Sequence, residues 1–249
     1  MRKYEETVIS LVEDFIPEVP PLRGFQQSNF YRGHADQSWE LNPTMFRADL
    51  EHTASESWIE LAQATQLKFK QLAPPEIRAQ MHSELEWGAV ATHHLTPTHF
   101  SAWSESALVG LYFATEETAD QADGAIWRLM PGFDEMTIFQ DYEQVKDAPR
   151  IYRPQFQTPE MTAQRVCFLT HPFPDSNLPP VSFENYYNTS DELMNLSKIT
   201  IPHDCKAQIR QQIAALGFDS RSIFPGLKGI GRQVSDEIYS HTKSYEWLM

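Results

Sequence analysis

Apolar residues in this 249-residue chain occur in runs of only a few residues, and 17 prolines are spread between them. A helix that spans a bilayer needs about 20 consecutive apolar residues, so the sequence predicts a soluble protein without a membrane span. Hydrophobic residues still make up 41% of the chain and aromatic residues 12%, enough for a large core. No repeat or Gly/Ser linker divides the sequence, so we expect a single domain over residues 1–249.

The cellular compartment is suggested by the N-terminus and the cysteines. The chain begins Met1-Arg2-Lys3 and then becomes acidic, with no apolar stretch of the kind that secretory signals contain. Only Cys167 and Cys205 are present, too few for a disulfide framework. We therefore expect a cytoplasmic protein.

The formal net charge is −14 and the isoelectric point is about 5.0. A field of this sign disfavours nonspecific binding to bulk DNA or RNA. It is compatible with a basic protein partner, either an acceptor or a neutralising protein. A local basic pocket is not excluded, because one arginine in a cleft can dominate the field there.

Four segments have helical patterns. Residues 3–15 form an amphipathic pattern. Residues 54–72 follow Thr53, which is spaced from Glu56 as in a capping box. Residues 75–91 and 106–115 are further candidates. Proline residues at positions 74 and 75 are expected to end the second helix.

Strand-like segments are short and lie between these helices. Runs rich in branched and aromatic residues predict strands at residues 30–33, 125–129, 164–170 and 198–201. A last helical pattern covers 204–216, with Gly217 as its C-cap, and residues 220–233 are expected to form an ordered loop before a short final helix. The sequence thus predicts an α+β fold with a small mixed or antiparallel β core flanked by helices.

Arg32 is the first candidate site residue. It follows two aromatic residues and precedes Gly33, so we expect it to point from a strand end into a cleft that the glycine keeps open. A fixed guanidinium there would clamp a phosphate or carboxylate through two hydrogen bonds. The alternative is a buried arginine that binds carbonyl oxygens at a turn.

The second candidate is the segment 93–104, which contains three His, two Thr and two Ser. Zinc sites use histidines at such spacings but need further ligands, and this segment has no cysteine. We therefore expect no metal. The alternative is that these side chains satisfy the backbone of a buried loop. Signatures of hydrolases and nucleotide-binding loops are absent, and residues 228–231 match only a fragment of one.

Several blocks resemble, in order, the motifs of the FRG family, which is named for a Phe-Arg-Gly triplet. In this chain they are Phe30–Gly33 with Leu41–Pro43 and Phe46-Arg47; His93–Ser104 with Leu111–Ala114; Asp123–Trp127; Gln164–Phe168; and Ile201-Pro202 with Ser222–Leu227. The resemblance extends from about residue 25 to residue 235.

The chain departs from the family at several positions. The Arg and Asp of the second block fall on His99 and Ala102, its Gln on Thr92 and its Gly on Leu95, and the closing Asp falls on Gly226. Joint loss of Arg and Asp is expected if they pair, because removing one alone would leave a buried charge unpaired. This favours a structural role for the pair; if the Asp were catalytic, this protein would be inactive.

A second resemblance is to ADP-ribosyltransferases. These enzymes carry an Arg, often in Tyr-Arg-Gly, on a first core strand, a Ser motif before a helix that ends in Phe-Ala, and a Glu or Gln/Glu element later. Tyr31–Gly33, Ser101, Ser104, residues 112–114 and Gln164 occur here in that order. The resemblance implies a split sheet, NAD as substrate, and an intracellular toxin or phage-defence effector.

In such a site Arg32 would bind the NAD diphosphate or the nicotinamide ribose, Ser104 would order the nicotinamide side, and Tyr112 would stack nearby. A carboxylate would stabilise the positive charge that develops as nicotinamide leaves. Gln164 cannot supply that charge, so Glu160 is the candidate. The resemblance assigns further NAD contacts to Tyr31, Gly33, His94, Thr98 and Ser101.

Three other functions are compatible with the same residues. A non-catalytic module would recognise a nucleotide or phosphorylated ligand through Arg32 and residues 93–99. A nuclease would use His93, His94 or His99 as acid and base, although no companion carboxylates are apparent. In a structural or partner-binding protein these motifs would be part of the core.

Overall fold

The computed structural model describes residues 4–21, 29–48, 50–53, 55–77, 81–116, 121–130, 149–155, 157–174, 178, 180–189 and 195–239. The strands are β1 Glu5–Val8, β2 Phe30–His34, β3 Phe100–Ser104, β4 Gly124–Met130, β5 Arg150–Tyr152, β6 Val166–Thr170 and β7 Asn195–Ile201. The helices are α1 Val12–Phe15, α2 Trp58–Leu72, α3 Glu84–His93, α4 Ala107–Ala114, α5 Pro159–Ala163, α6 Phe183–Thr189, α7 His203–Ala215, α8 Ser220–Ile223 and α9 Leu227–Tyr239. Short 3-10 turns are η1 Ile16–Glu18, η2 Thr44–Arg47 and η3 Leu50–His52.

The strands form one mixed sheet with the order β1-β7-β4-β2-β3-β6-β5. Only β1 and β7 are parallel; the other neighbours are antiparallel. The two central strands, β2 and β3, pair at one position, Tyr31 with Ser104. Because β2 pairs with β4, and β3 with β6, over their whole lengths, the sheet opens between β2 and β3.

The two faces of the sheet are covered differently. On one face a continuous apolar cluster crosses the opening, with Trp103 and Trp127 from the two halves, and α6 covers it. On the other face the core is divided. One cluster joins β2, β4 and β7 to α1, α4, α7 and α8, and another joins β3, β5 and β6 to α3 and α5.

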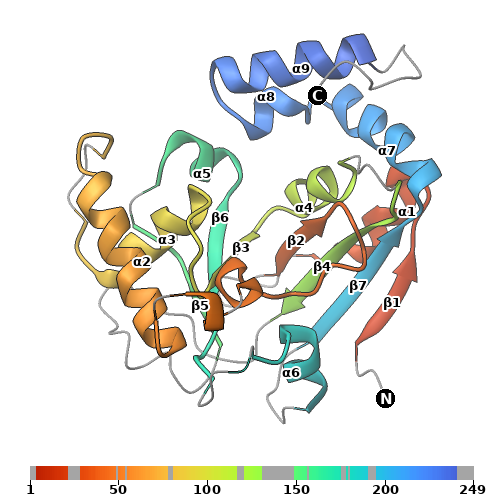
Figure 1. Ribbon diagram of the computed structural model, residues 1–249. Coiled ribbons are helices and arrows are strands. Elements are labelled where there is room, and N and C mark those ends of the chain that lie inside the picture. The colour runs from red at the N-terminus through yellow and green to blue at the C-terminus, as the bar shows by residue number, and fades with distance from the viewer. Residues whose placement is uncertain are drawn as a thin grey trace.

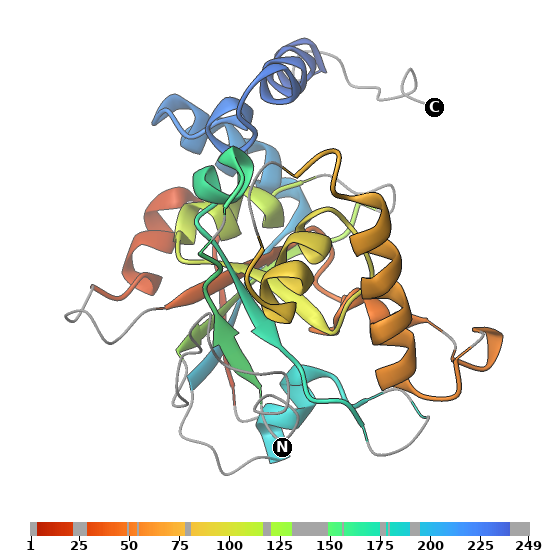
Figure 2. The same cartoon turned by 90° about the vertical axis from the view of Figure 1, so that its left-hand side faces the viewer.

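The arrangement of the helices follows from this division. In both views α7, α8 and α9 lie at one end of the sheet, while α2 lies on the side of α3 and the β6-β5 edge (Figure 1, Figure 2). Helix α6 lies at the end opposite α8 and α9 (Figure 1). No helix in the described ranges has the length and apolar character needed to cross a membrane.

Helix α4 is packed unusually close to β2. A Cβ atom added at Gly33 would lie 2.1 Å from the carbonyl oxygen of Gly110 and 2.6 Å from the backbone nitrogen of Ala114. Gly110 in turn faces Tyr31, whose Cβ atom would lie 3.0 Å from an added Cβ atom. Two glycines therefore let the helix backbone rest on the strand.

Much of the predicted fold is confirmed. The α+β class, the mixed sheet and the flanking helices are as expected. The strands predicted at 30–33, 125–129 and 198–201 correspond to β2, β4 and β7, and the helices at 106–115 and 204–216 to α4 and α7. Gly217 follows α7 with a φ of 85°, as a helix-ending glycine does.

The predicted N-terminal helix is wrong over residues 5–8. That segment is β1, which pairs in parallel with β7 from Glu5 to Val8. The edge of β7 offers unpaired backbone groups, and pairing with them outweighs a weak local helical pattern. The helix itself is limited to α1, and residue 3 lies outside the described ranges.

Two helices start later than predicted because a different serine caps each of them. Ser57 Oγ accepts a hydrogen bond from the backbone N–H of Glu60 at the start of α2, in place of the predicted Thr53. Ser83 Oγ does the same for Glu86 at the start of α3. Residues 54 and 78–80, which fall within the predicted helices, lie outside the described ranges.

Three other segments differ from the prediction. The polar segment 93–104, expected as a loop, ends in strand β3, which pairs with β6 over five residues. The strand predicted from Gln164 begins at Val166, and Gln164 is instead the C-cap of α5. Residues 220–233 form α8 and most of α9, not a loop.

We predict that Gly33→Ala destabilises the protein by about 3 kcal/mol, because the new methyl group must push α4 away from β2. Gly231→Ala is the matched control: its Cβ meets nothing within 4 Å, and alanine favours a helix over glycine by up to about 1 kcal/mol. Chemical denaturation of both variants measures the difference. Equal stabilities would contradict the close packing.

Candidate functional site

A pocket of about 510 Å³ lies where the sheet opens. Its walls come from β2 and β3, the turn after α3, and helices α4, α5 and α9. It therefore occupies the space between the two apolar clusters that share this face of the sheet. The volume is in the range of pockets that hold cofactor-sized molecules.

Arg32 lines this pocket from β2. Its Nε donates to His34 Nε2 at 2.9 Å, and its Nη1 donates to the carbonyl oxygen of Ala102 on β3 at 2.5 Å. The pKa of Arg32 is lowered to about 10, mainly by burial and to a smaller extent by the nearby charge of Arg47. The guanidinium therefore stays positive at neutral pH. Both hydrogen-bond acceptors are neutral, and no carboxylate among the described residues forms an ion pair with Arg32.

His34 fixes the orientation of Arg32. The Nδ1 atom of His34 lies 3.1 Å from the carbonyl oxygen of Trp39, so this nitrogen carries the proton and Nε2 accepts from Arg32. Burial, and next the charge of Arg32, hold the pKa of His34 well below its usual value. The imidazole is therefore neutral and cannot compensate the guanidinium.

Ser104 and Glu160 are linked through Gln164. The hydroxyl of Ser104 donates to the backbone carbonyl of Gln164 at 2.6 Å and accepts from the backbone N–H of Ser106. The side-chain amide of Gln164 donates to Glu160 Oε1 and to the carbonyl oxygen of Ile223, each at 3.3 Å. Helix α5 thus brings the carboxylate to the pocket, although Glu160 is not on a strand.

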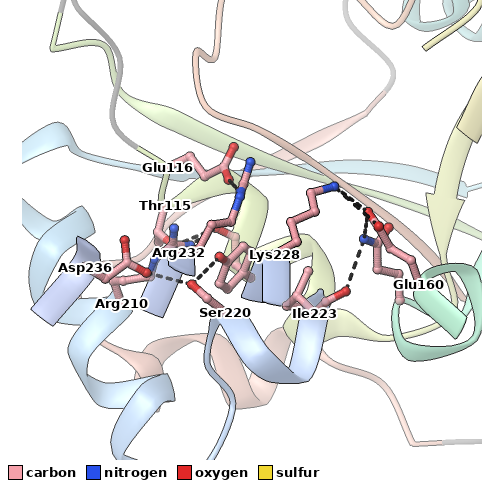
Figure 3. A network of polar contacts seen from close by, with 11 residues as sticks. Thr115, Glu116, Glu160, Arg210, Ser220, Ile223, Lys228, Arg232 and Asp236 are labelled. Atoms are coloured by element: carbon pink, nitrogen blue, oxygen red, sulfur yellow. Dashed lines mark hydrogen bonds and ion pairs between the residues drawn. The ribbon is translucent and has the colours of Figure 1, made fainter. Parts of the chain in front are cut away.

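Two ion pairs join the pocket to α9 (Figure 3). Lys228 Nζ lies 3.0 Å from Glu160 Oε1, and Arg232 Nη1 lies 3.1 Å from Glu116 Oε1. All four side chains line the pocket. Lys228 and Arg232 lie about one turn apart on α9. Glu160 comes from α5, and Glu116 from the segment that follows α4.

Most predicted site residues are brought together. Residues of the predicted site that line the pocket are Tyr31, Arg32, Gly33, His94, Ser104, Glu160 and Gln164. Gly33 makes its close approach to the backbone of α4. The predicted carboxylate therefore lies in the same pocket as the predicted arginine.

Three predicted residues lie elsewhere. Thr98 is buried and accepts a hydrogen bond from the backbone N–H of Phe100. Ser101 is buried against His171 and the indole N–H of Trp103, because neighbouring residues on β3 point to opposite faces. Tyr112 is buried and its hydroxyl contacts Ser220 at 2.9 Å, so it does not stack in the pocket.

The histidines of the segment 93–104 do not form an acid–base set. Burial lowers the pKa of His93 to about 4 and that of His99 to about 3, so neither is a proton donor at neutral pH. His99 packs against Phe100 and Phe173 with ring centroids 4.3 and 4.7 Å away. In the described part of the chain, no group of three or more His, Cys, Asp or Glu is arranged to hold a metal.

The two charged residues that the chain lacks relative to the FRG motif would occupy different environments. His99 lies in an aromatic cluster, whereas Ala102 lines the pocket and its carbonyl oxygen binds Arg32. Arg32 therefore keeps a charge that no side chain at position 102 neutralises.

Sequence reasoning missed Lys228, Arg232 and Glu116. Lys228 and Arg232 are four residues apart, which places them on one face of a helix. The glycines and the proline of residues 220–233 favour a loop, and a loop gives this spacing no meaning. Glu116 is the second residue after the helix that ends in Phe113-Ala114, and nothing in its local sequence marks it.

We predict that the free energy of unfolding falls as the pH drops below about 6.5. Burial lowers the pKa of His99 and of His171 to about 3, so the unfolded chain binds more protons between pH 3 and 6.5. Each residue then contributes a loss of about 2 kcal/mol between pH 7 and pH 5. Denaturation at both pH values should give a smaller loss for His99→Phe than for the wild type; equal losses would contradict a neutral, buried His99.

Comparisons with known proteins agree with the sequence motifs. Residues 27–123 match the family model of the FRG domain. No curated protein and no solved structure matches the chain. The matched segment contains Arg32, Ser104 and Glu116 but ends before Glu160 and α9. The predicted resemblance to the FRG domain is confirmed for this segment, residues 27–123.

Proposed function

We propose that the pocket binds NAD and that the protein is an ADP-ribosyltransferase-like enzyme. The observation that carries this proposal is that Arg32 and the carboxylate of Glu160 line the same pocket, and that Arg32 has no carboxylate partner among the described residues. Ser104 lines the pocket as well and is linked to Glu160 through Gln164. A cation suits the diphosphate of NAD, and a carboxylate suits the ribose that becomes positive when nicotinamide leaves.

The charge of Arg32 favours an anionic ligand. A partly buried cation whose hydrogen bonds go to neutral acceptors has lost water without gaining a counter-charge, and this is costly. A phosphate in the pocket would supply the missing charge and accept two parallel N–H bonds. The chain carries −14 overall, so this local positive charge contrasts with its surroundings.

The architecture also supports the proposal. The resemblance to ADP-ribosyltransferases implies a split sheet, and here β2 and β3 pair at a single position. Arg32 and Ser104 come from these two strands. A volume of about 510 Å³ suits a cofactor-sized molecule.

In the proposed reaction the glycosidic C–N bond between nicotinamide and ribose breaks, and nicotinamide leaves. An acceptor nucleophile forms the new bond to the same ribose carbon and releases its proton. Arg32 holds the diphosphate, and Glu160 stabilises the positive charge on the ribose. Gln164 is a positioning residue, because its amide holds Glu160 Oε1.

A non-catalytic module that binds a nucleotide or a phosphorylated ligand is the second candidate. It is favoured by the pairing of Glu160 with Lys228, which neutralises the carboxylate in the ligand-free protein. Such a module needs Arg32 but not Glu160, so the two residues separate the two candidates.

We predict that purified protein consumes NAD and releases nicotinamide, and that Arg32→Ala abolishes this turnover. The control is Arg221→Ala, which removes an exposed arginine paired with Asp219 outside the pocket. Nicotinamide release is measured with the protein alone and in cell lysate. Labelled NAD then identifies the acceptor and tests the expected role as a toxin or phage-defence effector.

We predict that Glu160→Gln lowers turnover about a hundredfold or more, because the amide keeps the shape but not the charge. The rise in melting temperature caused by NAD should persist in this variant. An NAD-dependent rise in the wild type that is lost in Arg32→Ala, without any turnover, would favour the binding module. If NAD produced neither turnover nor a rise, both candidates would be excluded for NAD.

A further inference from the structure

Lys228 and Arg232 are held at the pocket by an aromatic ring. Both lie over Phe224, with Lys228 Nζ 4.5 Å and the Arg232 guanidinium carbon 4.2 Å from the ring centroid. Phe224 is buried and packs edge-on against Tyr112 and Phe113. The two cations therefore have a fixed support on the pocket side of α9.

The rest of α9 is anchored away from the pocket (Figure 3). Ser220 donates to Asp236 Oδ2 at 2.7 Å and contacts the hydroxyl of Tyr112 at 2.9 Å. The guanidinium of Arg210 stacks on the ring of Tyr112 at 3.7 Å and donates to the Tyr112 carbonyl oxygen. Because this network holds α8 and α9 to α4 and α7, only side chains need to move for Lys228 and Arg232 to change partners.

Both cations have replaceable partners. The side chains of Lys228 and Arg232 are 54% and 44% exposed, and those of Glu160 and Glu116 are 29% and 34% exposed. Ion pairs with such exposure contribute about 0–1 kcal/mol. An incoming anion can therefore take the place of either carboxylate at a small energetic cost.

Among the described residues that line the pocket, the charges do not balance. Arg32, Lys228 and Arg232 are positive, and Glu116 and Glu160 are negative. A phosphate group accepts more hydrogen bonds than a carboxylate and pairs with the planar arginine fork through two of them. A diphosphate therefore suits this set better than the carboxylates already present.

We infer that Lys228 and Arg232 bind the phosphate groups of the ligand, and that they release Glu160 and Glu116 when they do so. Arg32 would then be one part of a larger anion-binding site, which also includes the two cations of α9. The inference deepens the proposed function and rests on it in one respect, since the released Glu160 is the carboxylate that would face the ribose. The ligand itself would thus make Glu160 available for the reaction.

The first test is the affinity of the full chain for inorganic pyrophosphate and NAD, measured by calorimetry. The double variant Lys228→Gln/Arg232→Gln should bind both about tenfold more weakly or worse, because charged hydrogen bonds are lost. The matched control is Lys70→Gln/Arg221→Gln, which removes two cations from ion pairs outside the pocket. Nicotinamide riboside, which has no phosphate, should be bound equally by all forms.

The second test uses a variant that is expected to bind pyrophosphate more tightly than the wild type. Glu160→Gln should bind pyrophosphate about threefold more tightly, since the anion no longer competes with a carboxylate for Lys228. Glu84→Gln, which removes the carboxylate of the Lys70 pair, should have no effect. Weaker or unchanged pyrophosphate binding by Glu160→Gln would contradict the exchange of partners.

The outcomes separate the inference from the proposed function. If the wild type binds pyrophosphate but not NAD, and the double variant binds neither, the anion site stands and the NAD proposal fails. If the double variant binds pyrophosphate as tightly as its control, or if the wild type does not bind pyrophosphate, the inference is overturned. In that last case, NAD turnover would still be decided separately by Arg32→Ala and Glu160→Gln.

Discussion

The contact on which the site depends is the packing of α4 on β2 at Gly33. Without a Cβ atom at this position, the backbone of α4 rests directly on the strand. The helix consequently belongs to the cluster over β2, β4 and β7, and α3 and α5 cover the other half of the sheet. Between these clusters β2 and β3 diverge after one pair. The pocket is the space that this division of the core leaves open.

The electrostatics of the pocket follow from the same division. Strand β2 contributes Arg32, whose acceptors are a neutral imidazole and a backbone carbonyl. The carboxylates of the pocket come from α5 and from the end of α4, and each is already paired with a cation of α9. Among the described cations that line the pocket, Arg32 is thus the one without a carboxylate partner. This is why the arrangement favours an anionic ligand in a protein whose net charge is −14.

The sequence predicted the parts of this site that depend on local signals. Phe30–Gly33 reads as a strand ending in glycine, and it is β2; residues 106–115 read as a helix, and they form α4. It did not predict β3, because polar residues such as Ser101 and Ser104 are typical of a loop, and the strand is held by its pairing with β6. The predicted strand begins at residue 164 and leaves Glu160 outside it, and a five-residue helix carries this carboxylate. Lys228 was missed because the glycines around it favour a loop over a helix.

The residues that line the pocket lie partly inside and partly outside the segment that matches the FRG domain. Residues 27–123 supply Arg32, Ser104 and Glu116, which all line the pocket, and Glu116 is the carboxylate that pairs with Arg232. Glu160, Lys228 and Arg232 lie beyond the match, on α5 and α9. A change in the later helices can therefore alter the charges that line the pocket without changing the residues of β2 or of α4. The absence of the family's Asp at Ala102 fits this division, because Glu160 and Glu116 supply carboxylates to the same pocket from other elements.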